Sequence, residues 1–130
     1  MNEKILIDAA ISAMKNSYSP YSGFCVGAAL LAESGKVYSG TNVENASFSV
    51  TSCAERSALF AAVSAGERKF SAIAVVGGKD GEITDFCPPC GVCRQALAEF
   101  CSPKANVYLF DGKSVKSLTL GELLPESLSL

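Results

Sequence analysis

Three cysteines and one glutamate are the residues of this sequence best suited to chemistry. Cys53 stands two residues before Glu55, and the later Cys90-x-x-Cys93 pair supplies two more thiols. The chain contains no histidine, so a site for a soft metal ion has to be built from thiolates. Three thiolates leave a tetrahedral zinc ion one ligand short, and catalytic zinc sites keep that position for water. The pattern therefore predicts a catalytic zinc site, with Glu55 as the proton-transfer group beside it.

Other uses of the paired cysteines stay open at this point. A Cys-x-x-Cys pair alone also occurs in redox proteins and in zinc ribbons. A redox pair usually follows a strand, whereas this pair follows Pro88 and Pro89, and a zinc ribbon needs a second close pair. A purely structural zinc site is the remaining alternative. The acidic residue two positions after Cys53 favours the catalytic interpretation.

The elements that must position these groups follow from hydrophobic periodicity and turn residues. We expect a first helix ending near Met14, helices over residues 53–65 and 91–100, and a helical turn over 120–124. The expected strands cover residues 24–33, 37–41, 70–77, 107–110 and 115–118. This order predicts an α/β fold, a three-layer α/β/α sandwich with one mixed five-stranded sheet, as a single domain over residues 1–130.

The negative charge of a three-thiolate zinc site has to be balanced by positive charge nearby. Both ligand segments fall at predicted helix starts, where the partial positive charge of the helix favours thiolate over thiol. Three thiolates around Zn²⁺ still leave the site with a net negative charge. Arg56 lies three residues after Cys53, on the same helix face, and is the candidate to balance it. Arg94, directly after Cys93, is a second candidate.

The remaining cysteines are expected to be inert. In a reducing compartment, six cysteines indicate metal binding, catalysis or burial rather than disulfides. Cys25 and Cys101 are interpreted as small buried hydrophobic residues, the first in a strand and the second at a helix end. Cys87 is separated from Cys90 by two prolines, and we interpret its position near the metal motif as incidental.

Composition excludes several classes of partner. The net charge is −2 and the pI is near 5.1. The 11 basic residues are scattered and form no stripe that could displace the counterions of a nucleic acid. The longest strongly apolar stretch, residues 24–32, is far below the roughly 20 residues of a membrane helix, and residues 1–13 lack the apolar run of a signal peptide. We therefore expect a cytoplasmic protein that binds a small molecule rather than nucleic acid or membrane.

Beyond these residues, nearly the whole chain resembles the small cytidine deaminases of pyrimidine salvage. The matching segments are Tyr18-Ser19-Pro20-Tyr21-Ser22-Gly23-Phe24, Val26-Gly27-Ala28-Ala29-Leu30, Gly40-Thr41-Asn42-Val43-Glu44-Asn45-Ala46, Cys53-Ala54-Glu55-Arg56, Pro89-Cys90-Gly91-Val92-Cys93-Arg94-Gln95 and Glu122-Leu123-Leu124-Pro125. The resemblance implies deamination of cytidine and 2′-deoxycytidine. It also implies one Zn²⁺ per subunit and a homotetramer with its sites at subunit interfaces.

The resemblance also assigns residues to the nucleoside. Asn42 and Glu44 correspond to the part of the family that binds the ribose hydroxyls. Phe24 corresponds to an aromatic wall near base and sugar, and Ala54 to a position whose backbone meets the pyrimidine ring. Two residues apart at a strand end, Asn42 and Glu44 also point to the same side, and an amide beside a carboxylate suits adjacent hydroxyls. Without the family, an ordinary polar loop after a hairpin is the alternative.

The sequence departs from the family pattern at three positions. Pro88 stands where the family often has serine, and Phe48 where it often has tyrosine. The family also often has a phenylalanine near the C-terminus that reaches a neighbouring subunit's site, and Leu128 is the nearest candidate here. The loss of that C-terminal aromatic residue concerns how the base is stacked, and it leaves the metal ligands and Glu55 unchanged.

The hypothesis for the reaction is hydrolytic. Water activated by zinc attacks C4 of the cytosine ring, while Glu55 takes a proton of the water and delivers it to N3. Glu55 then passes the remaining hydroxyl proton to the departing amine, which leaves as ammonia. One competing hypothesis is a deaminase of another small aminopyrimidine, such as blasticidin S, or of a guanine-type base. A nucleic-acid-editing deaminase and a non-catalytic structural zinc module are two further hypotheses.

Overall fold

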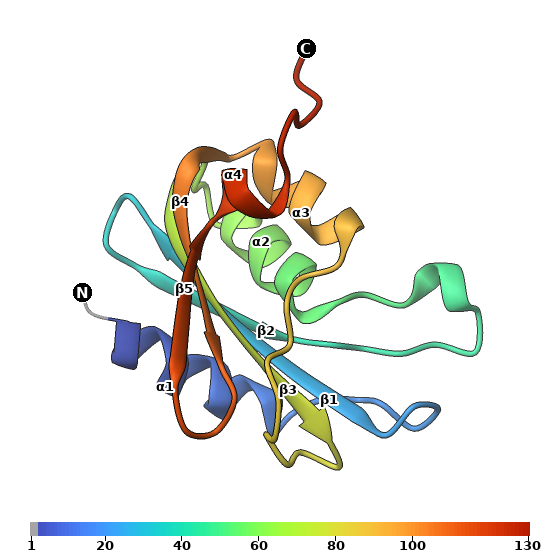
Figure 1. The fold of residues 1–130 in the computed structure, drawn as a ribbon. Helices are drawn as coiled ribbons and strands as arrows, with labels where there is room; N and C mark the ends of the chain where they lie inside the picture. The colour runs from blue at the N-terminus through green and yellow to red at the C-terminus, as the bar shows by residue number, and fades with distance from the viewer. Residues whose placement is uncertain (1–2) are drawn as a thin grey trace.

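The computed structural model describes residues 3–130, which are organised around one mixed five-stranded sheet (Figure 1). The strands lie in the order β2-β1-β3-β4-β5. Their bounds are β1 Phe24–Ala32, β2 Val37–Thr41, β3 Phe70–Lys79, β4 Cys101–Phe110 and β5 Val115–Thr119. Only β3 and β4 run parallel, and the other three neighbouring pairs are antiparallel. The predicted α/β class with a mixed five-stranded sheet is confirmed.

Helices cover both faces of this sheet. Along β3, the side chains of Ala74 and Val76 face α1, whereas Ile73 and Val75 face the opposite layer, because successive strand residues alternate between faces. The helices are α1 Glu3–Met14 on one face, and α2 Ala54–Ser64, α3 Gly91–Ala98 and α4 Leu120–Leu123 on the other (Figure 1). The predicted three-layer α/β/α arrangement is therefore confirmed. No helix within residues 3–130 is long and apolar enough to cross a membrane.

Two glycines let the helices approach the sheet closely. A Cβ atom added to Gly40 on β2 would lie 2.4 Å from the backbone nitrogen of Ala58 in α2. A Cβ atom added to Gly27 on β1 would lie 2.0 Å from the carbonyl oxygen of Ala10 in α1. Only glycine fits at such contacts without displacing backbone. Gly40 thereby seats α2, the helix that carries Glu55, directly against the sheet.

The largest boundary difference from the sequence prediction is in β4. This strand begins at Cys101 rather than at residue 107, so Cys101 lies in a strand and not at a helix end. Its first residues include Pro103 and Lys104, which are poor strand formers, and its pairing with β3 shifts register between Phe70 and Ala72. The first residues of β4 therefore lack the alternation of apolar and polar residues by which a strand is predicted from sequence. Elsewhere β3 extends two residues further than expected, to Lys79.

Candidate active site

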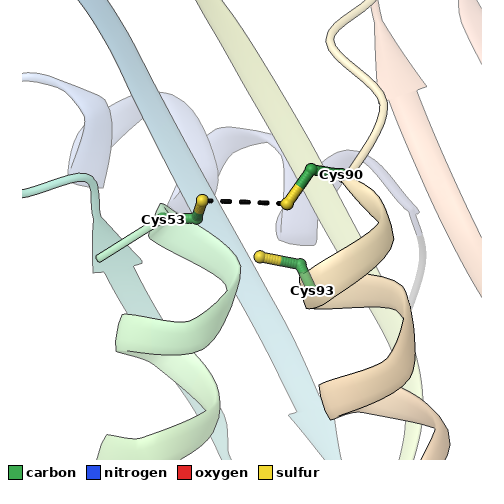
Figure 2. A group of neighbouring side chains, drawn as sticks. All are labelled: Cys53, Cys90 and Cys93. Carbon is green, nitrogen blue, oxygen red and sulfur yellow. Dashed lines mark hydrogen bonds between the residues drawn. The ribbon is translucent and has the colours of Figure 1, made fainter. Parts of the chain in front are cut away.

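The three predicted metal ligands lie together in the structure. The sulfurs of Cys53, Cys90 and Cys93 are all within 4.8 Å of one another, and those of Cys53 and Cys90 are 3.9 Å apart. Figure 2 shows the three side chains converging from the beginnings of two helices. A tetrahedral zinc ion with Zn–S bonds of about 2.3 Å requires sulfurs about 3.8 Å apart. The donor set and its spacing therefore fit zinc.

Helix starts position all three sulfurs. Cys53 is the N-cap residue of α2, and Cys90 is the N-cap residue of α3, each with extended backbone and no hydrogen bond from its side chain to the helix. Cys93 lies in the first turn of α3 and is fully buried. Because the side chains of Cys53 and Cys90 leave the first backbone N–H groups of both helices uncapped, the partial positive charge of two helix ends is directed at the cluster.

Hydrogen bonds hold one of the thiols as a thiolate. The pKa of Cys53 is lowered to about 5, first by a hydrogen bond from the Cys93 thiol and also by the guanidinium of Arg56. The Nη2 of Arg56 lies 3.4 Å from the sulfur of Cys53. The pKa of Cys93 is raised, because its proton is shared with Cys53 and because the thiol is buried. The positive charge of Arg56 thus lies beside the sulfur of Cys53.

Arg94 does not share this position. Its Nε donates to the carbonyl oxygen of Pro89 at 2.7 Å, and its Nη1 donates to the carbonyl oxygen of Leu123 at 2.8 Å. Neighbouring residues on a helix point about 100° apart, so the residue after Cys93 is directed away from the sulfurs. The expectation that Arg94 balances the charge of the metal site is therefore wrong.

Glu55 is the buried acid of the site. It lies in the first turn of α2, with 4% of its surface exposed, and it lines the same cavity as Cys53. Burial raises the pKa of Glu55, and the negative charge of Cys53 acts in the same direction. A carboxyl group with a raised pKa exchanges protons more readily near neutral pH than an exposed one.

One cavity connects Glu55 with the residues expected to bind a nucleoside. It has a volume of about 290 Å³ and is lined by Phe24, Asn42, Glu44, Cys53, Ala54, Glu55 and Cys90, among others. The volume is at the lower end of the range for small-molecule sites, about 300 Å³ and above. A larger hollow of about 640 Å³ lies near the beginnings of β3 and β4 and is lined by Phe70 and Cys101, not by the metal cluster.

Asn42 and Glu44 are held firmly by their own chain. Asn42 is buried, its Oδ1 accepts from the backbone N–H of Val26 at 2.9 Å, and its Nδ2 donates to the carbonyl of Phe24 at 2.8 Å. The carboxylate of Glu44 accepts hydrogen bonds from the backbone of Tyr21 and from both the backbone and the hydroxyl of Ser22. Its pKa is lowered, first by the Ser22 hydroxyl. Both side chains are therefore preassembled at the cavity wall.

Several lining residues were missed from the sequence, namely Ser22, Val26, Thr51, Ser52, Cys87 and Pro88. Cys87 is half-buried and stands in the cavity wall, although its sulfur is not one of the three that cluster. Burial raises the pKa of Cys87 to about 11, so it is a neutral thiol at physiological pH. Of these residues, only Ser22 could have been found from the sequence. It belongs to the turn directly before Phe24, and turn residues beside a predicted site residue are candidates for the cavity wall.

The two exposed departures from the family pattern lie outside the cavity wall. The side chain of Leu128 is 68% exposed, and its backbone is paired with the side-chain amide of Gln95. Phe48 is 81% exposed and begins a short 3-10 helix, η1 (Phe48–Val50), in a segment that extends away from the body of the molecule (Figure 1). Both apolar side chains therefore face outward in the isolated chain.

Comparisons with known proteins agree with this geometry. The model of the cytidine and deoxycytidylate deaminase zinc-binding region matches residues 1–109. A cytidine deaminase of Sporosarcina psychrophila is 47% identical over 130 residues, which cover 99% of this chain and 93% of the relative. The crystal structure of cytidine deaminase from Burkholderia pseudomallei has a TM-score of 0.90 at 46% identity, covering 98% of this chain and 100% of that one. A blasticidin-S deaminase of Bacillus cereus is 33% identical over 104 residues, 77% of this chain and 74% of the relative.

Proposed function

The chain belongs to the cytidine deaminase family, and from this premise we propose that it hydrolyses cytidine and 2′-deoxycytidine to uridine and 2′-deoxyuridine in pyrimidine salvage, with release of ammonia. The observation that carries the proposal is that a zinc-binding cluster of three sulfurs, a buried carboxyl group and two preassembled polar side chains border one cavity.

Zinc is the cofactor of the site, and we assign Cys53, Cys90 and Cys93 as its ligands. When bound, it supplies the Lewis acidity that makes water a nucleophile near neutral pH. Three thiolates weaken this effect through their negative charge. Arg56 offsets that charge through its contact with the sulfur of Cys53, and the N-termini of α2 and α3 add to the offset.

Glu55 moves the protons of the reaction in this proposal. It accepts a proton from the water that adds to C4 of the cytosine ring and delivers that proton to N3. It then transfers the remaining hydroxyl proton to the C4 amino group, which leaves as ammonia while the C4 carbonyl forms. Each proton taken from water is returned to the substrate, so Glu55 ends the cycle in its starting state. Its burial beside the sulfur cluster supports this role.

The other end of the cavity is assigned to the sugar and the base. Asn42 uses one Nδ2–H for Phe24, and its second Nδ2–H has no partner within residues 3–130, so it can donate to a ribose hydroxyl. The lowered pKa of Glu44 keeps it an ionised acceptor for a hydroxyl. Phe24 offers its ring as an aromatic wall, and the backbone of Ala54 lies between the sugar end and Glu55.

A homotetramer with sites at subunit interfaces completes the proposal. Phe48 and Val50 are 81% and 64% exposed on the projecting segment that follows the Asn42–Glu44 region. Exposed apolar side chains gathered on one segment mark a contact surface. All six cysteines are free thiols, and a three-thiolate site requires reduced cysteines, which supports a cytoplasmic location. Light scattering after size-exclusion chromatography tests the assembly, and a monomeric mass contradicts it.

The decisive experiment is an absorbance assay of nucleoside conversion with and without a chelator. We expect cytidine and 2′-deoxycytidine to be consumed with one ammonia released per nucleoside, and we expect chelation to abolish turnover and added zinc to restore it. Free cytosine should react far more slowly, because it lacks the sugar that Asn42 and Glu44 bind. Bound zinc without ammonia release from any nucleoside would show a structural zinc module instead.

Deamination of blasticidin S is the second candidate function. The 33% identity to a blasticidin-S deaminase supports it, since that protein shares the same family. The same assay compares the two substrates directly. We expect kcat/KM for cytidine to exceed that for blasticidin S, and the reverse order would replace cytidine as the principal substrate.

A further inference from the structure

The three zinc ligands differ in how firmly the protein holds them. Cys93 is fully buried between helices, and Cys53 is half-buried with its sulfur hydrogen-bonded to Arg56. Cys90 is the exposed member of the cluster, and its side chain makes no capping bond to α3. Neither burial nor a helix cap therefore fixes the Cys90 side chain, so its position depends on how its backbone is held.

Arg94 holds that backbone from both sides. Its side-chain Nε donates to the carbonyl oxygen of Pro89 at 2.7 Å, and its backbone N–H donates to the carbonyl oxygen of Cys90 at 2.9 Å. These two carbonyls belong to the planar peptide groups on either side of the Cys90 Cα. Fixing both planes restrains φ and ψ of Cys90, which are −69° and 167°. The second bond is the ordinary helical bond of this position, so the bond to Pro89 is what the Arg94 side chain adds to the direction in which the Cys90 side chain leaves the chain.

The third contact of Arg94 ties this arrangement to another element. Its Nη1 donates to the carbonyl oxygen of Leu123, the last residue of α4, at 2.8 Å. A capping box between Thr119 and Glu122 fixes the other end of α4. Gln95, the next residue of α3, pairs through its side-chain amide with the backbone of Leu128. The C-terminal segment is thus attached to α3 at two successive residues, but only Arg94 also contacts the Cys90 backbone.

We propose that Arg94 is a positioning residue of the metal centre, which fixes the backbone of Cys90 against α4 and so slows the loss of zinc. The inference rests on the assignment of Cys90 as a zinc ligand. The most exposed ligand is the first to leave a metal when its backbone is loose, and groups that orient ligands change metal affinity by about 10- to 100-fold. Arg94 acts through hydrogen bonds to the chain, whereas Arg56 acts on a sulfur directly.

The test compares two Arg94 variants with a matched control on the same helix. Zinc transfer to excess chelator is followed with a colorimetric indicator for the parent, Arg94→Met, Arg94→Lys and Gln95→Ala. We expect Arg94→Met to release zinc about tenfold faster or more. Arg94→Lys, whose ammonium reaches one carbonyl where the guanidinium reaches two, should fall between Arg94→Met and the parent. Gln95→Ala loses a contact with the C-terminal segment and should release zinc within about twofold of the parental rate.

A spectroscopic readout separates ligand positioning from general loosening. In the Co²⁺-substituted proteins, the thiolate-to-cobalt charge-transfer band should shift for Arg94→Met and stay parental for Gln95→Ala. Parental zinc release and parental spectra in Arg94→Met overturn the inference. If Arg94→Met does not fold, Arg94→Lys decides in the same way. If the parent itself binds no zinc, the ligand assignment fails instead, so the two failures are distinguishable.

Discussion

The two ends of the substrate cavity differ in how far the chain satisfies its own polar groups. At the metal end, three sulfurs face one another, and a cation is needed to complete the group. At the sugar end, Asn42 is hydrogen-bonded to the backbone of β1, and Glu44 accepts hydrogen bonds from the backbone of the loop before β1. The metal end is therefore completed by its ligand, whereas the sugar end is part of the folded framework. Substitutions at the metal end should change zinc content and turnover. Substitutions at the sugar end should also change the stability of the fold.

The largest effect is expected from Cys93→Ser. This change replaces the buried sulfur of the cluster with a hydroxyl that is a poor zinc ligand, so zinc and cytidine turnover should both be lost. Metal content by atomic emission and uridine formation measure the two effects. Cys101→Ala is the control, because Cys101 lies at the start of β4 and should keep both. A zinc-loaded, active Cys93→Ser protein would remove Cys93 from the ligand set.

Arg56→Gln should have the next largest effect. Without the guanidinium, the pKa of Cys53 rises, and a proton competes more strongly with zinc for the sulfur. We expect zinc affinity to fall by about 10- to 100-fold in chelator competition, with a smaller loss for Arg56→Lys, which keeps the charge. Affinity equal to that of the parent for Arg56→Gln would show that the helix ends alone balance the cluster.

Asn42→Ala should affect binding and stability together. It leaves the backbone N–H of Val26 and the carbonyl of Phe24 without their side-chain partner, at a cost of about 1–3 kcal/mol in the free energy of unfolding. Loss of a hydrogen bond to the sugar should raise KM for cytidine about tenfold. Ser17→Ala removes only the hydroxyl that donates to Asn42, so it should lower stability with KM unchanged. Equal KM in Asn42→Ala and the parent would contradict the sugar assignment.

The smallest effect concerns the acid stability supported by Glu44. The folded-state pKa of Glu44 is below its ordinary value of 4.5, so its ionised form stabilises the protein above that pH. The stabilisation is lost as pH falls through the lower folded-state pKa. The Tm difference between the parent and Glu44→Gln should be greatest above the ordinary pKa of 4.5 and should shrink as the pH falls below it. Asp111 does not line the cavity, and Asp111→Asn should show a Tm difference that shrinks in the same direction, below the ordinary pKa of 3.8, with KM unchanged. A difference independent of pH would contradict this explanation.

The same contrast explains what the sequence could predict. Each ligand motif is short and lies at a helix start, and the need of one zinc ion for three thiolates predicts that Cys53 and Cys90 meet although they are 37 residues apart. The nearly continuous apolar runs of β1 and β3 likewise predict strands that are covered on both faces. At the sugar end, the partners of Glu44 are the backbone groups of Tyr21 and Ser22, more than 20 residues earlier. No local pattern encodes such contacts, and family resemblance was needed to select these residues.

Loops and irregular strands set the remaining limits. The loop before Pro89 has no periodicity, so the presence of Cys87 in the cavity wall could not be inferred. The position of Arg94 directly after Cys93 predicts a contact with the sulfurs, but its side chain donates to two carbonyl oxygens, one of them on α4. The early start of β4 contains Pro103, which normally argues against a strand. Each of these features depends on contacts between distant segments rather than on composition.

The most direct test of the central claim is the zinc content and turnover of Glu55→Gln measured on one preparation. The proposed role of Glu55 is proton transfer without metal ligation, so the variant should keep one zinc per chain while kcat for cytidine falls about a thousandfold. The nearly isosteric amide cannot accept the proton of water. Zinc content equal to that of the parent with turnover close to that of the parent would contradict the claim that Glu55 carries the protons.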